Sequence, residues 1–122
     1  MKKIYYIDEV EIKNQRVLAR VDFDVSLNPD HSIANDVRIK QNLPTLKYLL
    51  KNNNRLICVA KLNRPKSRDP KHSLKPVVER LREYLPDNKI TLVDDFLTCD
   101  QNIFKDQKPG EILVLENIRF YP

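Results

Sequence analysis

Four short apolar runs separated by helical patterns constrain the fold of this 122-residue chain more than any other feature. The runs are expected strands, and they cover residues 16–23, 55–60, 90–93 and 111–115. Three of them are almost continuously apolar, which is typical of parallel strands that are covered by helices. We therefore expect a three-layer, Rossmann-like α/β fold, with a mainly parallel sheet and helices on both of its faces.

Helical patterns fill the three gaps between the expected strands. The first pattern begins near Asn35 as a capping residue and contains Pro44, and the second follows Ser73 as its cap. A third and weaker pattern covers residues 95–106. The alternation predicts one domain over residues 1–122, and we expect this domain to be incomplete, because a doubly wound sheet continues with another helix after its last strand.

Composition narrows the class of protein. Hydrophobic residues make up 41% of the chain and charged residues 32%, and no apolar run approaches the roughly 20 residues of a membrane span. The N-terminus lacks the pattern of a secretion signal. We expect a cytoplasmic protein without membrane contact, whose two cysteines are free thiols. With one glycine, the sequence contains no glycine-rich loop that could hold a nucleotide phosphate.

The net charge of +5 indicates an anionic partner. Charged residues follow the carboxyl ends of the expected strands or begin the first helix: Asp22, Asp24, Arg38, Lys61, Arg64, Lys66, Arg68, Asp94, Asp95, Glu116 and Arg119. Because the carboxyl ends of parallel strands meet at one edge of a sheet, we expect a mostly basic rim there. Such a rim suits a phosphorylated small acid, although each of these residues could instead be a solvated loop residue.

Five stretches, in one order, resemble the signatures of phosphoglycerate kinases. They are residues 16–25 (RVLARVDFDV), 35–39 (NDVRI), 43–49 (LPTLKYL), 61–66 (KLNRPK) and 115–120 (LENIRF). They resemble the family patterns R-V-L-x-R-x-D-F-N-V-P, D-D-T-R-I, L-P-T-I-x-Y-L, H-L-G-R-P-K and L-E-N-L-R-F. Over nearly its whole length the chain is thus similar to the N-terminal, substrate-binding domain of this family.

The resemblance implies reversible phosphoryl transfer in glycolysis, from 1,3-bisphosphoglycerate to ADP, giving 3-phosphoglycerate and ATP. It implies that 3-phosphoglycerate or 1,3-bisphosphoglycerate binds to this chain. The family binds Mg²⁺ and ADP or ATP through a C-terminal domain that has no counterpart here, so we expect no metal or nucleotide ligands in this sequence. We expect the chain alone to be inactive as a kinase, and a separate nucleotide-binding domain is a candidate partner.

The resemblance also implies a set of site residues. Arg38 is the implied catalytic residue, which stabilises charge on the transferring phosphoryl group. The implied substrate-binding residues are Asp22, Phe23, Asp24, Arg38, Lys61, Leu62, Asn63, Arg64 and Arg119. Those at positions 22 and 24 are expected at the hydroxyl and carboxylate end of the glycerate, and the basic ones at its phosphate.

Three of these positions differ from the family pattern. Asp24 replaces an asparagine, Lys61 replaces a histidine, and Asn63 replaces a glycine. We hypothesise that Asp24 and Lys61 compensate each other as an ion pair. Asn63 is expected to take the left-handed backbone conformation of the glycine, which asparagine tolerates better than most residues.

Two alternative functions stay open. The first is a non-catalytic remnant domain that binds phosphorylated acids or a protein partner, and the changes at positions 24, 61 and 63 favour it. The second is nucleic-acid binding by the basic segment 61–71, which we do not expect because no aromatic residues interleave with its charges. Asp94 and Asp95 are expected to cap a helix, and His31 and His72 to serve as exposed or capping residues and not as metal ligands.

Overall fold

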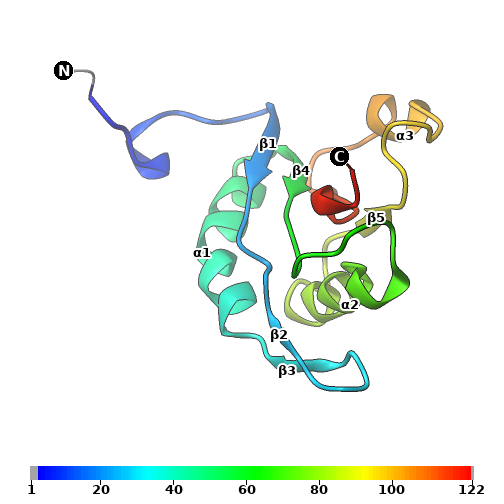
Figure 1. Ribbon diagram of the computed structural model, residues 1–122. Coiled ribbons are helices and arrows are strands. Elements are labelled where there is room, and N and C mark those ends of the chain that lie inside the picture. The colour runs from blue at the N-terminus through cyan, green and yellow to red at the C-terminus, as the bar shows by residue number, and fades with distance from the viewer. Residues whose placement is uncertain (1–2, 122) are drawn as a thin grey trace.

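Four parallel strands form the centre of the molecule in a computed structural model that describes residues 3–121 (Figure 1). They are β1 (Arg16–Arg20), β4 (Arg55–Val59), β5 (Ile90–Val93) and β6 (Ile112–Leu115). Their order in the sheet is β1-β4-β6-β5, and all three pairings are parallel. The prediction of an α/β fold with a mainly parallel sheet is confirmed.

Helices lie between the strands, as the sequence predicts. They are α1 (Val37–Lys51), α2 (Lys75–Tyr84) and α3 (Asn102–Lys105), with 3-10 turns η1 (Ile7–Glu9), η2 (Pro70–His72) and η3 (Ile118–Phe120). Most of the weak helical pattern at 95–106 is therefore not helical. A short antiparallel hairpin of β2 (Ser26–Leu27) and β3 (Ile33–Asn35) was not expected. Among residues 3–121, no helix is both long enough and apolar enough to cross a membrane.

The main hydrophobic core lies between the sheet and the two long helices, α1 and α2. Its buried members include Leu56, Cys58, Ile112 and Val114 from the strands and Ile39, Leu46, Leu49, Val77, Val78 and Leu81 from the helices. The strand members alternate along their strands, so one face of the sheet supplies them. Both cysteines are free, as predicted, and burial raises the pKa of the Cys58 thiol to about 12.

The opposite face of the sheet carries the short helix α3. Leu113 alternates with the core residues of β6, and together with Ile103 of α3 it lines a cavity on this second face. Arg16 Nη2 donates a hydrogen bond of 2.5 Å to the Phe104 carbonyl oxygen of α3. Helices thus lie on both faces, as expected, but α3 leaves the edge strand β1 open, where Leu18 is 68% exposed.

Two sets of hydrogen bonds fix the start of α1. One set joins residues within this start, and the other joins it to α2. Asp36 occupies the capping position, and its carboxylate accepts hydrogen bonds from Arg80 Nη1 at 2.6 Å and from the Tyr84 hydroxyl. The bond from Tyr84 and then that from Arg80 lower the pKa of Asp36. The predicted cap, Asn35, accepts from the Val37 amide at 2.9 Å.

A buried acid fixes the start of α2. Glu116, which directly follows β6, accepts hydrogen bonds from the Ser73 hydroxyl at 2.7 Å and from the Leu74 amide at 2.8 Å. Leu74 and not the predicted Ser73 occupies the capping position, but the Ser73 hydroxyl, one residue earlier, accepts from the Lys75 amide. A carboxylate at a helix N-terminus is favoured by the helix dipole, so this contact ties the end of β6 to α2.

Replacing Leu56 with Ala should lower the free energy of unfolding by about 2–5 kcal/mol, because this side chain is fully buried in β4. Leu18→Ala, on the neighbouring strand β1, should change the free energy by less than about 0.5 kcal/mol, because Leu18 is largely exposed. Urea unfolding followed by circular dichroism measures both values. Equal losses of unfolding free energy in the two variants would contradict the finding that Leu56 is buried on one face of the sheet while Leu18, on the other face, is exposed.

Candidate functional site

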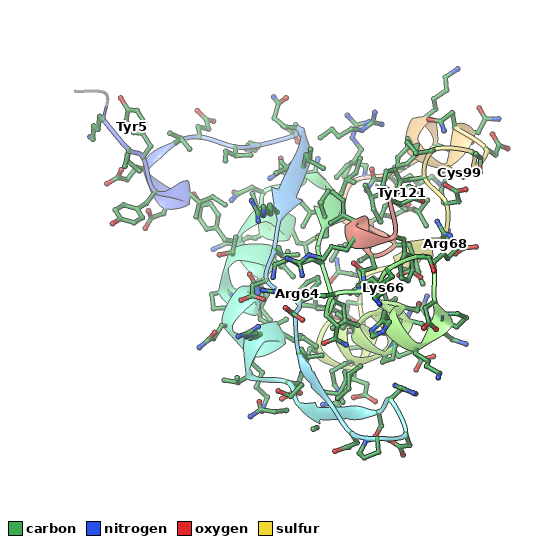
Figure 2. The ribbon with its side chains drawn as sticks, viewed as in Figure 1. Tyr5, Arg64, Lys66, Arg68, Cys99 and Tyr121 are labelled. Atoms are coloured by element: carbon green, nitrogen blue, oxygen red, sulfur yellow. The ribbon has the colours of Figure 1, made fainter. Side chains whose placement is uncertain are left out.

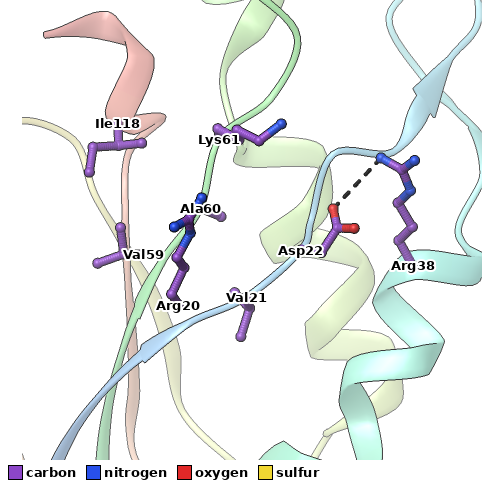
Figure 3. Close-up of a pocket in the computed structure, with 8 residues that line it drawn as sticks. All are labelled: Arg20, Val21, Asp22, Arg38, Val59, Ala60, Lys61 and Ile118. Carbon is purple, nitrogen blue, oxygen red and sulfur yellow. Dashed lines mark ion pairs between the residues drawn. The ribbon is translucent and has the colours of Figure 1, made fainter.

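A cavity of about 650 Å³ lies where the carboxyl ends of β1 and β4 meet (Figure 3). Its lining residues come from both strand ends, from α1 and from η3, and they are Arg20, Val21, Asp22, Arg38, Val59, Ala60, Lys61 and Ile118. Ligands of parallel α/β sheets bind at this edge. The structure thus brings three predicted site residues, Asp22, Arg38 and Lys61, to one cavity, and adds Arg20 as a third cation.

Arg38 reaches from the first turn of α1 toward the loop that follows β1. Its Nη1 lies 3.7 Å from Asp22 Oδ1, and Figure 3 shows this ion pair. The same Nη1 donates a hydrogen bond of 2.6 Å to the Asp24 carbonyl oxygen. The guanidinium side chain is half exposed. A cation at a helix N-terminus is disfavoured by the helix dipole, and the nearby carboxylates offset this cost.

The predicted ion pair between Asp24 and Lys61 is present. Lys61 Nζ lies 3.3 Å from Asp24 Oδ2, and the Asn63 amide donates to Asp24 Oδ1 at 2.9 Å. Arg38 Nη1 is 4.0 Å from Asp24 Oδ2. One carboxylate therefore links the loop after β1 to the loop after β4.

The surroundings of Asp24 favour its charged form. Partial burial raises the pKa of Asp24, but the hydrogen bonds from the Asn63 amide and the Lys61 ammonium act against burial. The positive charges of Lys61 and Arg38 act in the same direction as these bonds. Together they hold the pKa of Asp24 below its ordinary value, so this carboxylate is ionised near neutral pH.

The loop after β4 takes the predicted left-handed turn. Asn63 has φ of 54°, which is the conformation expected where the family pattern has glycine. Arg119 Nη1 donates a hydrogen bond of 2.8 Å to the Asn63 carbonyl oxygen. Part of the donor capacity of Arg119 thus goes to the backbone of this loop.

Sequence reasoning does not single out Asn117, which holds the same loop in place. The Asn117 side chain is buried, its Oδ1 accepts from the Leu62 amide at 3.2 Å, and its Nδ2 donates to the Leu62 carbonyl oxygen at 2.7 Å. Its Nδ2 also donates to the carbonyl oxygen of His72 at 2.9 Å. The available signal is a pair of polar residues, Glu116 and Asn117, after an apolar strand, but this signal does not distinguish a buried amide from a solvated one.

Six predicted site residues are not among those that line this cavity: Phe23, Asp24, Leu62, Asn63, Arg64 and Arg119. Phe23 and Leu62 are fully buried in the core, so their side chains support the loops from beneath. Arg64 is exposed and is not among the residues that line the cavity, within the part of the chain that the structure describes. The rim seen in the structure is therefore smaller than the predicted one.

Arg68 is held by neighbours at the carboxyl end of β5 (Figure 2). Its Nη1 donates to the Asp94 carboxylate at 3.2 Å, its Nη2 donates to the Tyr121 hydroxyl at 2.8 Å, and its guanidinium lies over the rings of Phe120 and Tyr121. Asp95 accepts from the amide of Leu97, as expected of a capping residue, but the segment that it caps is a turn and not a helix.

The described residues do not form a metal site of the usual kind. Across residues 3–121, no group of three or more His, Cys, Asp or Glu side chains is placed to hold a metal ion. His72 lies beside the cavity loop, where its Nδ1 is 3.2 Å from Asn63 Nδ2. The cavity carries the cationic side chains of Arg20, Arg38 and Lys61 beside the Asp22 carboxylate, and cations of this kind bind oxyanions.

Comparisons with known proteins point to one family. A family model described as phosphoglycerate kinase matches residues 7–122. The phosphoglycerate kinase of Aquifex aeolicus is 41% identical over 114 residues, which are 93% of this chain and 28% of that protein. Phosphoglycerate kinase 3, cytosolic, of Arabidopsis thaliana is 38% identical over 115 residues, covering 94% of this chain and 29% of its own length.

A solved structure also matches. The phosphoglycerate kinase of Coxiella burnetii superposes with a TM-score of 0.81 and 28% sequence identity, covering 95% of this chain and 28% of that chain. The chain thus spans about 30% of the length of the curated relatives that it matches.

Replacing Asn117 with Ala should lower the free energy of unfolding by about 2–4 kcal/mol, because it leaves the buried amide and carbonyl groups of Leu62 without partners. Asn102→Ala, at an exposed position of α3, should cost less than about 1 kcal/mol. Urea unfolding measures both. A loss at Asn117 no larger than that at Asn102 would show that the Asn117 bonds do not hold the loop.

The stability that the Asp24 carboxylate contributes should depend on pH. The folded-state pKa is lowered, so its contribution is present above the unfolded-state pKa of about 3.9 and is lost as pH falls through the lower folded-state value. The difference in unfolding free energy between the wild type and Asp24→Asn should therefore shrink as pH falls from 7 to about 3. Urea titrations at several pH values test this, and a difference that is independent of pH would contradict it.

Proposed function

The chain belongs to the phosphoglycerate kinase family, and from this premise we propose that it supplies the glycerate-binding part of such a kinase. The observation that carries the proposal is the meeting of Arg38 and Lys61 at one cavity, at the carboxyl ends of two parallel strands. The full reaction would be reversible phosphoryl transfer between 1,3-bisphosphoglycerate and ADP, within glycolysis. The ligand of this chain would be 3-phosphoglycerate or 1,3-bisphosphoglycerate.

The chemistry of phosphoryl transfer fits such a site. The bond between phosphorus and the acyl oxygen breaks, a new bond forms from phosphorus to a terminal oxygen of ADP, and the glycerate leaves as a carboxylate. The reaction needs no nucleophile from the protein, because positioning and neutralisation of charge supply most of the catalysis. Cations fixed at a cavity are what this chain offers.

Each residue would have one role in this proposal. Arg38 would stabilise charge on the transferring phosphoryl group, because its half-exposed guanidinium faces the cavity from a fixed helix start. Lys61 and Arg119 would hold phosphate oxygens, with Arg64 as an outer contact. Asp22 would accept a hydrogen bond from the glycerate hydroxyl group.

Nucleotide and Mg²⁺ would bind outside the residues described here. The family resemblance assigns both ligands to a C-terminal domain, and the regions matched in the relatives make up only about 30% of their length. Within residues 3–121 there is no acidic cluster that would suit Mg²⁺, so we assign no step of the reaction to a metal held by this chain. A location in the cytoplasm is proposed as well, and the name of the Arabidopsis relative supports it.

A second candidate function is a non-catalytic module that binds phosphorylated acids or a protein partner. The Asp24 carboxylate favours it, because this group already pairs with Lys61 and with the Asn63 amide. A bound phosphoryl donor would have to share these donors with Asp24. Binding without transfer would fit this arrangement.

Isothermal titration with 3-phosphoglycerate tests the proposed ligand. We expect binding to the 122-residue chain that weakens at least about tenfold in Arg38→Ala, because a charged hydrogen bond contributes about 1.5–3 kcal/mol. Lys47→Ala removes the same charge from an exposed position farther along α1 and should leave the affinity unchanged within about twofold.

Two results would contradict the proposal. One is the absence of binding by the wild type while its circular dichroism spectrum shows a folded α/β protein. The other is an equal loss of affinity in Arg38→Ala and Lys47→Ala, which would indicate general attraction to a basic protein. Titration with glycerate, which lacks the phosphate, distinguishes a phosphate site from a hydroxy-acid site.

A further inference from the structure

The donors of the proposed phosphate site already hold an anion that belongs to the chain itself. The carboxylate of Asp24 accepts from Lys61 Nζ at 3.3 Å through Oδ2 and from the Asn63 amide at 2.9 Å through Oδ1. An ammonium group and an amide of a left-handed turn are the kind of donors that phosphate oxygens use. The side chain of Asp24 is 21% exposed, so it fills these positions from within the site.

The remaining charged groups around Asp24 strengthen its hold. Arg38 donates to the Asp24 carbonyl oxygen and lies 4.0 Å from its carboxylate, so it attracts this group as well. Asp22, the other nearby acid, accepts from the Asp24 amide at 3.1 Å and so fixes the backbone. Arg119 holds the loop from the other side, through the Asn63 carbonyl oxygen.

Two cavities meet at this ion pair. Lys61 lines the cavity of about 650 Å³ at the end of β1 and β4. Asp24 and Asn63 line a second one of about 440 Å³, next to the hairpin of β2 and β3, and Arg38 lines both. A carboxylate that left Lys61 would therefore have open space beside it, without moving the core residues beneath.

We propose that Asp24 is an internal competitor of the anionic ligand: its carboxylate occupies Lys61 and the Asn63 amide, and a phosphate must displace it to bind. This inference rests on the proposed function of the same cavity. A tethered competitor lowers the apparent affinity of every anion that must displace it by the same factor. Free phosphate, which makes few further contacts, would then bind weakly, whereas a phosphorylated hydroxy acid could offset this cost with its additional contacts.

The experiment compares the wild type with Asp24→Asn. Inorganic phosphate is titrated into the 122-residue chain labelled with ¹⁵N, and the amide resonance of Asn63 reports on the site. We expect Asp24→Asn to bind phosphate about tenfold more tightly than the wild type, with Asn63 among the shifted resonances. Asp87→Asn, in the exposed loop after α2, makes the same change in net charge and should match the wild type.

The same comparison in a Lys61→Gln protein distinguishes displacement of the Asp24 carboxylate by phosphate from general repulsion between the two anions. In Lys61→Gln the Asp24 carboxylate keeps only its bond to the Asn63 amide, so the further change Asp24→Asn should raise the affinity by less than it does in the wild-type background. An equal gain in both backgrounds would overturn the inference, because repulsion by a nearby carboxylate does not require Lys61. No gain in Asp24→Asn, or no binding of phosphate by a folded Asp24→Asn variant, would overturn it as well.

A parallel titration with 3-phosphoglycerate keeps the two proposals distinguishable. If the wild type binds 3-phosphoglycerate and Asp24→Asn binds neither ligand more tightly, the internal competitor is wrong and the proposed function stands. If Asp24→Asn gains affinity for phosphate while neither protein prefers 3-phosphoglycerate, the competitor stands and the proposed substrate is wrong. A urea titration of each variant verifies that it is folded.

Discussion

Parallel pairing of β1 with β4 is the constraint on which the rest of the site depends. The register sets Arg20 beside Val59, so both strands end at the same level and the loops that follow them lie next to each other. Those loops begin with Val21 and Ala60, both buried, and then turn outward with polar residues. An antiparallel pairing would place the end of one strand beside the start of the other, and these loops would lie at opposite edges of the sheet.

This arrangement gathers like charges, and the fold must offset their repulsion. Arg20, Arg38 and Lys61 line one cavity, where their like charges repel one another. The two carboxylates of the loop after β1 are placed between them, within 4.0 Å of Arg38 or Lys61. The acids that keep the cations together without a ligand are thus the groups that an anionic ligand would have to replace or share the cations with. At such a site, stability of the unliganded chain and affinity for an anion would be opposed.

Local patterns explain how much of the fold could be predicted. The order of strands and helices follows from the period of the hydrophobic residues and from the capping residues. Both are local features of the sequence. The hairpin of β2 and β3 could not be predicted, because its strands have two and three residues and their pairing follows from tertiary contacts. The weak pattern at 95–106 forms helix only at Asn102–Lys105 because Asp95 and Thr98 first make a hydrogen-bonded turn.

The sequence could predict those contacts of the site that depend only on where a residue lies relative to the end of a strand. Asp24 and Lys61 each follow one of two neighbouring strands, so their ion pair follows from the topology. The direction of a loop side chain depends instead on contacts that the sequence does not reveal. The Arg64 side chain therefore lies outside the cavity lining, and the bonds of Asn117 were not anticipated.

The open edge of β1 has a consequence for the boundaries of the cavity. In a doubly wound sheet the first strand is usually central and has neighbours on both sides, whereas the described strands all lie on one side of β1. An edge strand presents backbone donors and acceptors to any strand that aligns with it, and the exposed Leu18 offers apolar contact there. A further parallel strand at this edge would end beside Arg20 and add a third loop to the rim. A strand that paired with β1 would therefore help to set the size of the ligand that the cavity could accept.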